Sequence, residues 1–105
     1  MSFTIHDLET RVHQRASESA EVSYTRKLLD KGVAHCAKKL GEEAVETAIA
    51  AVSEDREHLI AESADLLYHL LVLLEARGVT LSEVEAVLSA RQAQSGLEEK
   101  ASRKG

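Results

Sequence analysis

The chain has 105 residues, no proline, five glycines, one cysteine and a formal net charge of −5. Its abundance of Ala, Leu and Glu predicts an all-α fold: one domain over residues 1–105, built as a compact bundle of about four to five helices. The negative charge argues against nucleic acid or an anionic membrane as a partner, and no segment approaches the roughly 20 apolar residues that span a bilayer. The single cysteine and the lack of a signal-peptide apolar region predict a cytoplasmic protein.

The first half of the chain predicts two short helices. A capping-box pattern at residues 4–7 opens a helix over about residues 5–16. A polar connection, 17–22, follows. Ser23 then leads into a short helix that Gly32 interrupts or ends.

The second half predicts two long helices and a shorter one. Apolar residues at helical spacing indicate helices over about residues 33–52 and 57–76, and the polar break between them suits a tight antiparallel connection. Gly78 is the expected C-cap of the second long helix, and the last helix begins near Leu81. We expect the charged tail, 97–105, to be mobile unless a ligand or partner holds it.

The helix over residues 57–76 is apolar on nearly every side between Leu66 and Leu74. Such a helix is typically central, so we expect its own domain and a second subunit to cover it. Tyr68 and His69 are therefore expected to be core residues, with the histidine hydrogen-bonded. Cys36 lacks the neighbours of a nucleophile.

Two carboxylate pairs, each spaced i, i+3, lie on the two long helices. Folding the chain back at Glu54 sets the pairs at matching heights, so four side chains are expected to surround a hard cation, Mg²⁺ or Mn²⁺. The four predicted metal ligands are Glu43, Glu46, Glu62 and Asp65. The alternative is an ordinary solvated helix face. A di-iron site is rejected because no histidine follows a glutamate by three residues.

The adjoining Glu42 is predicted to be a further ligand, a general base or a solvated residue. A basic segment precedes the carboxylates and is interpreted as the half of the site that binds phosphate. Its cations are Arg26, Lys27, Lys31, Lys38 and Lys39. A solvated surface is the alternative, as is an i, i+4 salt bridge between Lys39 and Glu43. Three residues beside it, Ser23, Tyr24 and Thr25, are expected to line a substrate pocket or to pack.

Four segments closely resemble the phosphoribosyl-ATP pyrophosphohydrolase family: SYTRKLL (23–29), KKLGEEAVE (38–46), ESADLLYHLL (62–71) and SGLEEKASRK (95–104). The resemblance covers nearly the whole chain. The pattern Glu-x-x-Glu followed by Glu-x-x-Asp is shared by the wider all-α nucleotide pyrophosphohydrolase superfamily, and the other residues of these segments narrow it to this family.

The resemblance implies hydrolysis of phosphoribosyl-ATP to phosphoribosyl-AMP and pyrophosphate, the second step of histidine biosynthesis. It also implies a Mg²⁺ cofactor and a cytoplasmic homodimer. The family's domain is fused to a cyclohydrolase in many organisms, and this chain, too short to include one, is expected to be the stand-alone form. Glu42, Glu43 and Glu46 are the expected catalytic residues. Two alternatives remain: a house-cleaning pyrophosphohydrolase acting on noncanonical nucleoside triphosphates, and a non-catalytic helical interaction module.

Overall fold

The computed structural model describes residues 2–53 and 55–92. This part of the chain forms α-helices and no strands: α1 (Ile5–Ala16), α2 (Tyr24–Asp30), α3 (Val33–Ser53), α4 (Arg56–Arg77) and α5 (Leu81–Arg91). The predicted all-α fold is confirmed, and all five predicted helices are present. Glu54 and the predicted tail, 97–105, lie outside the described residues. None of the helices described is both long enough and apolar enough to cross a membrane.

Side-chain caps and glycines set the helix boundaries. The Thr4 hydroxyl accepts a hydrogen bond from the Asp7 backbone N–H, and the Asp7 carboxylate accepts one from the Thr4 N–H, which is the predicted capping box. The Asp55 carboxylate accepts a hydrogen bond from the His58 backbone N–H and so caps α4. Gly32 and Gly78 have φ values of 96° and 68°, which side chains disfavour, and they end α2 and α4.

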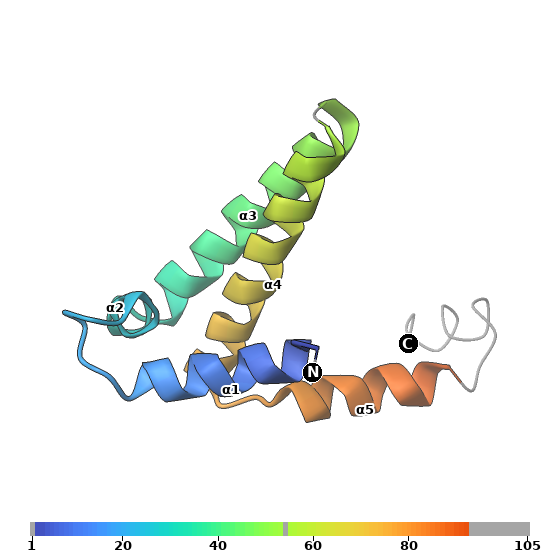
Figure 1. Cartoon of the computed structure of the whole chain (residues 1–105). Coiled ribbons are helices and arrows are strands. Elements are labelled where there is room, and N and C mark those ends of the chain that lie inside the picture. Colours follow the sequence, from blue (N-terminus) through green and yellow to red (C-terminus); the bar gives the residue numbers. More distant parts are fainter. Residues whose placement is uncertain (1, 54, 93–105) are drawn as a thin grey trace.

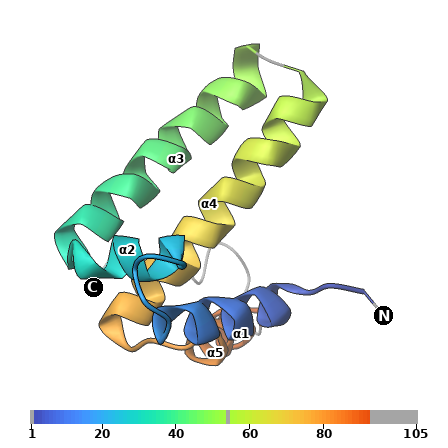
Figure 2. The same ribbon diagram turned by 60° about the vertical axis from the view of Figure 1, so that its left-hand side comes forward.

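The long helices α3 and α4 run antiparallel as a hairpin, and α1 crosses the base of this hairpin (Figure 1). In the rotated view, α2 lies beside the first turns of α3 (Figure 2). The core sits where these four helices meet and consists of Val12, Leu28, Cys36, Leu71 and Val72. Near its start, α5 is tied to α1 because the Leu81 N–H donates to the Glu9 carboxylate at 2.7 Å.

The far half of the hairpin has little cover from its own chain. On α3, Val45, Ile49 and Val52 form an apolar stripe at positions i, i+4 and i+7, with exposed fractions of 59%, 50% and 86%. On α4, Ile60 and Leu67 are also exposed. The buried residues of α4 all lie in its C-terminal half: His69, Leu71 and Val72.

Candidate metal centre

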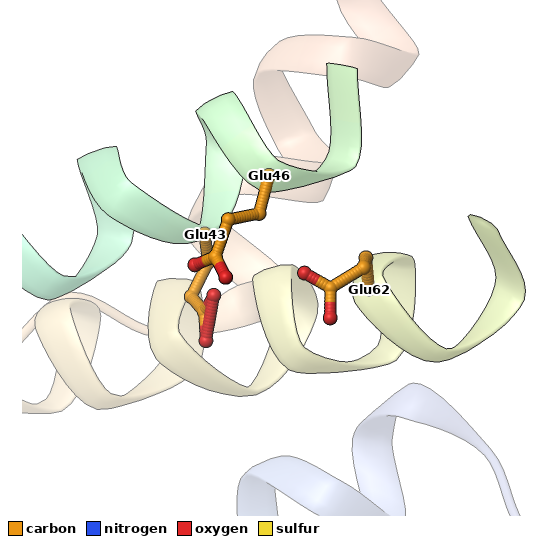
Figure 3. A group of neighbouring side chains, drawn as sticks. All are labelled: Glu43, Glu46 and Glu62. Atoms are coloured by element: carbon orange, nitrogen blue, oxygen red, sulfur yellow. The ribbon is translucent and has the colours of Figure 1, made fainter. Parts of the chain in front are cut away.

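Three carboxylates from two helices meet between α3 and α4. Oxygen atoms of Glu43 and Glu46 on α3 and of Glu62 on α4 all lie within 4.8 Å of one another. Figure 3 shows the Glu62 carboxylate pointing across the gap toward the other two. Glu46 is exposed, whereas Glu43 and Glu62 are partly buried. We call these three residues the carboxylate trio.

Thr47 fixes the height at which the two helices meet. Its hydroxyl lies 2.8 Å from the backbone carbonyl of Glu43, on its own helix, and 3.1 Å from the carbonyl of Glu62, on α4. Ala50, one turn further along α3, is fully buried, and its small side chain allows the helices to approach closely. Together, these contacts hold the backbones that carry the trio at one level.

The negative charges of the trio repel one another. A hydrogen bond with Glu46, burial, and the charges of Glu46, Asp65 and Glu62 raise the pKa of Glu43 to about 7. A divalent cation would relieve this repulsion, and an all-oxygen set of this kind suits Mg²⁺ or Mn²⁺. The donor set therefore fits such an ion.

Asp65, the fourth predicted ligand, lies outside the trio. It is one turn beyond Glu62 on α4, is exposed, and affects the pKa values of Glu43 and His69 through its charge. The structure thus brings together three of the four predicted ligands.

His69 lies beside the trio, which we did not predict. The ring is buried, and its Nε2 is 3.9 Å from Glu43 Oε1. Burial and the positive charge of Lys39 lower the pKa of this histidine. The spacing in the sequence could have indicated this position. His69 follows Glu62 by seven residues, or about two helical turns, and therefore lies on the same face of α4.

Lys39 interacts electrostatically with Glu43 of the trio and with the adjoining Glu42. Its Nζ is 3.5 Å from Glu42 Oε1, so the ion pair forms with Glu42 rather than with the predicted Glu43. A hydrogen bond with Glu42 raises the pKa of Lys39, and the charge of Glu43 adds to this effect. Lys27, Lys31 and Lys38 are exposed, and they form no ion pair with any residue in the described ranges.

Arg26 and Ser23 have other partners. The Arg26 guanidinium binds the Asp30 carboxylate at 2.7 Å and the Ala16 carbonyl at 2.9 Å. The buried Ser23 hydroxyl donates to the Arg15 carbonyl at 2.9 Å and accepts from the Arg26 N–H at 3.0 Å, which caps α2. Both side chains connect α1 to α2.

Thr25 and Tyr24 differ in exposure. Thr25 is buried, and its hydroxyl lies 2.6 Å from the Tyr68 hydroxyl. Tyr24 is 56% exposed. Thr25 is therefore packed in the interior, whereas Tyr24 is open to solvent.

The fold and the trio define an all-α protein with a carboxylate-rich candidate site for a divalent cation. The family model for phosphoribosyl-ATP pyrophosphohydrolase matches residues 5–92. A phosphoribosyl-ATP pyrophosphatase 1 from Bradyrhizobium diazoefficiens is 71% identical over 97% of this chain and 96% of its own. Phosphoribosyl-ATP pyrophosphatases from Rhodopseudomonas palustris and Paracoccus denitrificans are 66% and 56% identical, over 97% and 95% of this chain and 95% and 93% of their own. The chain belongs to the phosphoribosyl-ATP pyrophosphohydrolase family and is a hydrolase.

Proposed function

We propose that this protein hydrolyses phosphoribosyl-ATP to phosphoribosyl-AMP and pyrophosphate with Mg²⁺ as cofactor, as the second step of histidine biosynthesis in the cytoplasm. The observation that carries the proposal is the meeting of three carboxylates from α3 and α4 in a chain of this family. A magnesium site with few protein ligands leaves positions on the ion for phosphate oxygens, and a nearby lysine adds positive charge. Such a site suits a substrate with a triphosphate.

The trio and Asp65 would hold the cation. When bound, Mg²⁺ supplies positive charge that neutralises phosphate oxygens and stabilises the charge developing on them. Thr47 keeps the two helices in register, and His69 packs against Glu43. Lys39 would offer its ammonium group to the phosphates.

The remaining predicted residues keep proposed roles around the trio. Glu42, exposed beside the trio, would accept the proton of the attacking water. Tyr24 and Thr25 would face the substrate. Three exposed lysines would bind its phosphates: Lys27, Lys31 and Lys38. Ser23 and Arg26 would act indirectly, by holding α2 against α1.

The test is an assay of purified protein with phosphoribosyl-ATP, with and without Mg²⁺, that follows pyrophosphate and the nucleotide product. We expect metal-dependent release of pyrophosphate, a large loss in Glu62→Gln, and normal activity in Glu57→Gln, a matched change at an exposed site on the same helix. Hydrolysis of simple nucleoside triphosphates alone would refute the substrate assignment. Inactivity toward both, from folded protein, would refute enzymatic function at this site.

We also propose that a second copy of the chain covers the apolar stripe of Val45, Ile49 and Val52. Three large apolar side chains in one row, each at least half exposed, are unusual on the surface of a monomer. A homodimer would bury this row. Light scattering after size-exclusion chromatography should give twice the chain mass, and a monomer at all working concentrations would refute the proposal.

A further inference from the structure

A pocket lined by two arginines lies between α1, α2 and α4. Its volume is about 240 Å³, and its polar lining consists of Arg11, Arg15, Tyr24, Thr25 and Tyr68. None of the described residues that line it carries a carboxylate. The cavity beside Arg26 differs, because Glu75 lines it and Asp30 neutralises that arginine. The pocket on α1 is therefore suited to an anion.

The two arginines keep their donors available. Arg11 and Arg15 are four residues apart and so project from one face of α1. Arg11 makes no ion pair with any residue in the two described ranges, and Arg15 has only a long contact, 3.9 Å, with the exposed Glu18. Two guanidinium groups on one side of a small pocket are well suited to a phosphate, which accepts paired hydrogen bonds from each.

Two hydroxyls add a further donor. Thr25 and Tyr68 share one hydrogen bond of 2.6 Å, in which either oxygen can be the donor. One of the two O–H groups is used in this bond, and the other is left to donate to a ligand. The pocket therefore offers a neutral donor beside its two cations.

The pocket lies on the segment of α4 that also serves the trio. Tyr68 directly precedes His69, which contacts Glu43, and the two rings are 5.1 Å apart between centroids. Glu62 is six residues earlier, about 9 Å along the helix axis. A ligand with phosphates at both ends could thus bridge the pocket and the trio.

We propose that Arg11 and Arg15 bind the phosphate monoester on the second ribose of phosphoribosyl-ATP. This phosphate is at the far end of the molecule from the triphosphate and is lacking in ordinary nucleoside triphosphates. The pocket would thereby select phosphoribosyl-ATP over ATP. The inference rests on the proposed function.

The test compares two substrates: phosphoribosyl-ATP and the analogue whose second ribose carries no phosphate. The variants are Arg11→Gln, Arg15→Gln and the charge-conserving Arg11→Lys, with Arg77→Gln at an exposed position of α4 as the matched control. We expect each glutamine variant to lose about 10- to 100-fold in kcat/KM for phosphoribosyl-ATP, mainly through KM. Its kcat/KM for the analogue should not change. The lysine variant should retain part of the activity.

Equal losses of kcat/KM on both substrates would overturn the inference. They would mean that the arginines stabilise the fold or bind the triphosphate, which both substrates carry. No loss on either substrate would overturn it as well. Wild-type protein that releases no pyrophosphate from either compound would overturn the proposed function instead, and this inference with it. Thermal melts monitored by circular dichroism establish that each variant is folded.

Discussion

Glu43 is expected to destabilise the metal-free protein at neutral and alkaline pH. Its pKa is about 7 in the folded chain against an ordinary 4.5, so between these values the folded state binds more protons than the unfolded state. The free energy of unfolding therefore falls as pH rises through this window and stays low above it. The variant Glu43→Gln, which keeps the shape and removes the charge, should abolish this dependence.

The magnitude follows from the pKa change. A rise from 4.5 to about 7 corresponds to about 3 kcal/mol. Water around the exposed Glu46 screens part of the repulsion, so we expect about 2 kcal/mol. In the presence of a chelator at pH 8, Glu43→Gln should be more stable than the wild type by this amount. At pH 4 the two should be nearly equal, because Glu43 is then largely protonated in both the folded and the unfolded state.

The assay is urea denaturation at a fixed protein concentration, in chelator and in excess Mg²⁺, at both pH values. Mg²⁺ at 100 times its dissociation constant should stabilise the wild type at pH 8 by about 2.7 kcal/mol and should stabilise the variant far less. Glu57→Gln is the control, as an exposed glutamate on α4. If Glu43→Gln were less stable than the wild type at pH 8 without metal, or gained as much from Mg²⁺, the electrostatic argument would be wrong.

Three further predictions concern the helix framework. Thr47→Val should lower the free energy of unfolding by about 1 kcal/mol and weaken Mn²⁺ binding measured by EPR, whereas Thr47→Ser, which keeps the hydroxyl, should do neither. Ser23→Ala should cost about 1–2 kcal/mol in denaturant melts with little change in kcat, since this serine caps α2; an unchanged melt would contradict that role. Ile49→Lys should yield a monomer by light scattering, while the same change at the exposed Ala51, off the apolar stripe, should leave the dimer intact.

Helix positions could be predicted because their signals are local. The capping box at Thr4 and the glycines at positions 32 and 78 depend on backbone conformation within a few residues, and the structure places the ends of α1, α2 and α4 there. The height at which α3 meets α4 could also be predicted, since a short connection leaves an antiparallel pair few possible registers. The Thr47 contact with the Glu62 carbonyl is consistent with that register.

The details of the site depend on side-chain rotamers and on helix rotation, which spacing does not determine. Lys39 is followed by glutamates three and four residues later on α3. Both spacings allow a salt bridge on a helix, so the sequence alone does not decide that Glu42 becomes the partner. The charge of Arg26 predicts a phosphate ligand, but its guanidinium donates to a backbone carbonyl ten residues earlier in the chain. No motif distinguishes Arg11 within α1, and its position at a pocket follows only from how α1 packs against α2 and α4.

The apolar stripe adjoins Glu46, the exposed member of the trio, because Val45 and Glu46 line one cavity on α3; a dimer formed through the stripe would therefore connect assembly to cation binding. Val45 precedes Glu46, and Ile49 is one turn beyond Val45 on α3. A second copy covering this row would keep water from one side of the carboxylates, and charges attract a cation more strongly where water is excluded. We therefore expect the affinity for Mn²⁺ to rise with protein concentration across the range in which the dimer forms. EPR titrations at concentrations below and above that range would measure it, and an affinity that stayed constant while the mass doubled would show that the two are independent.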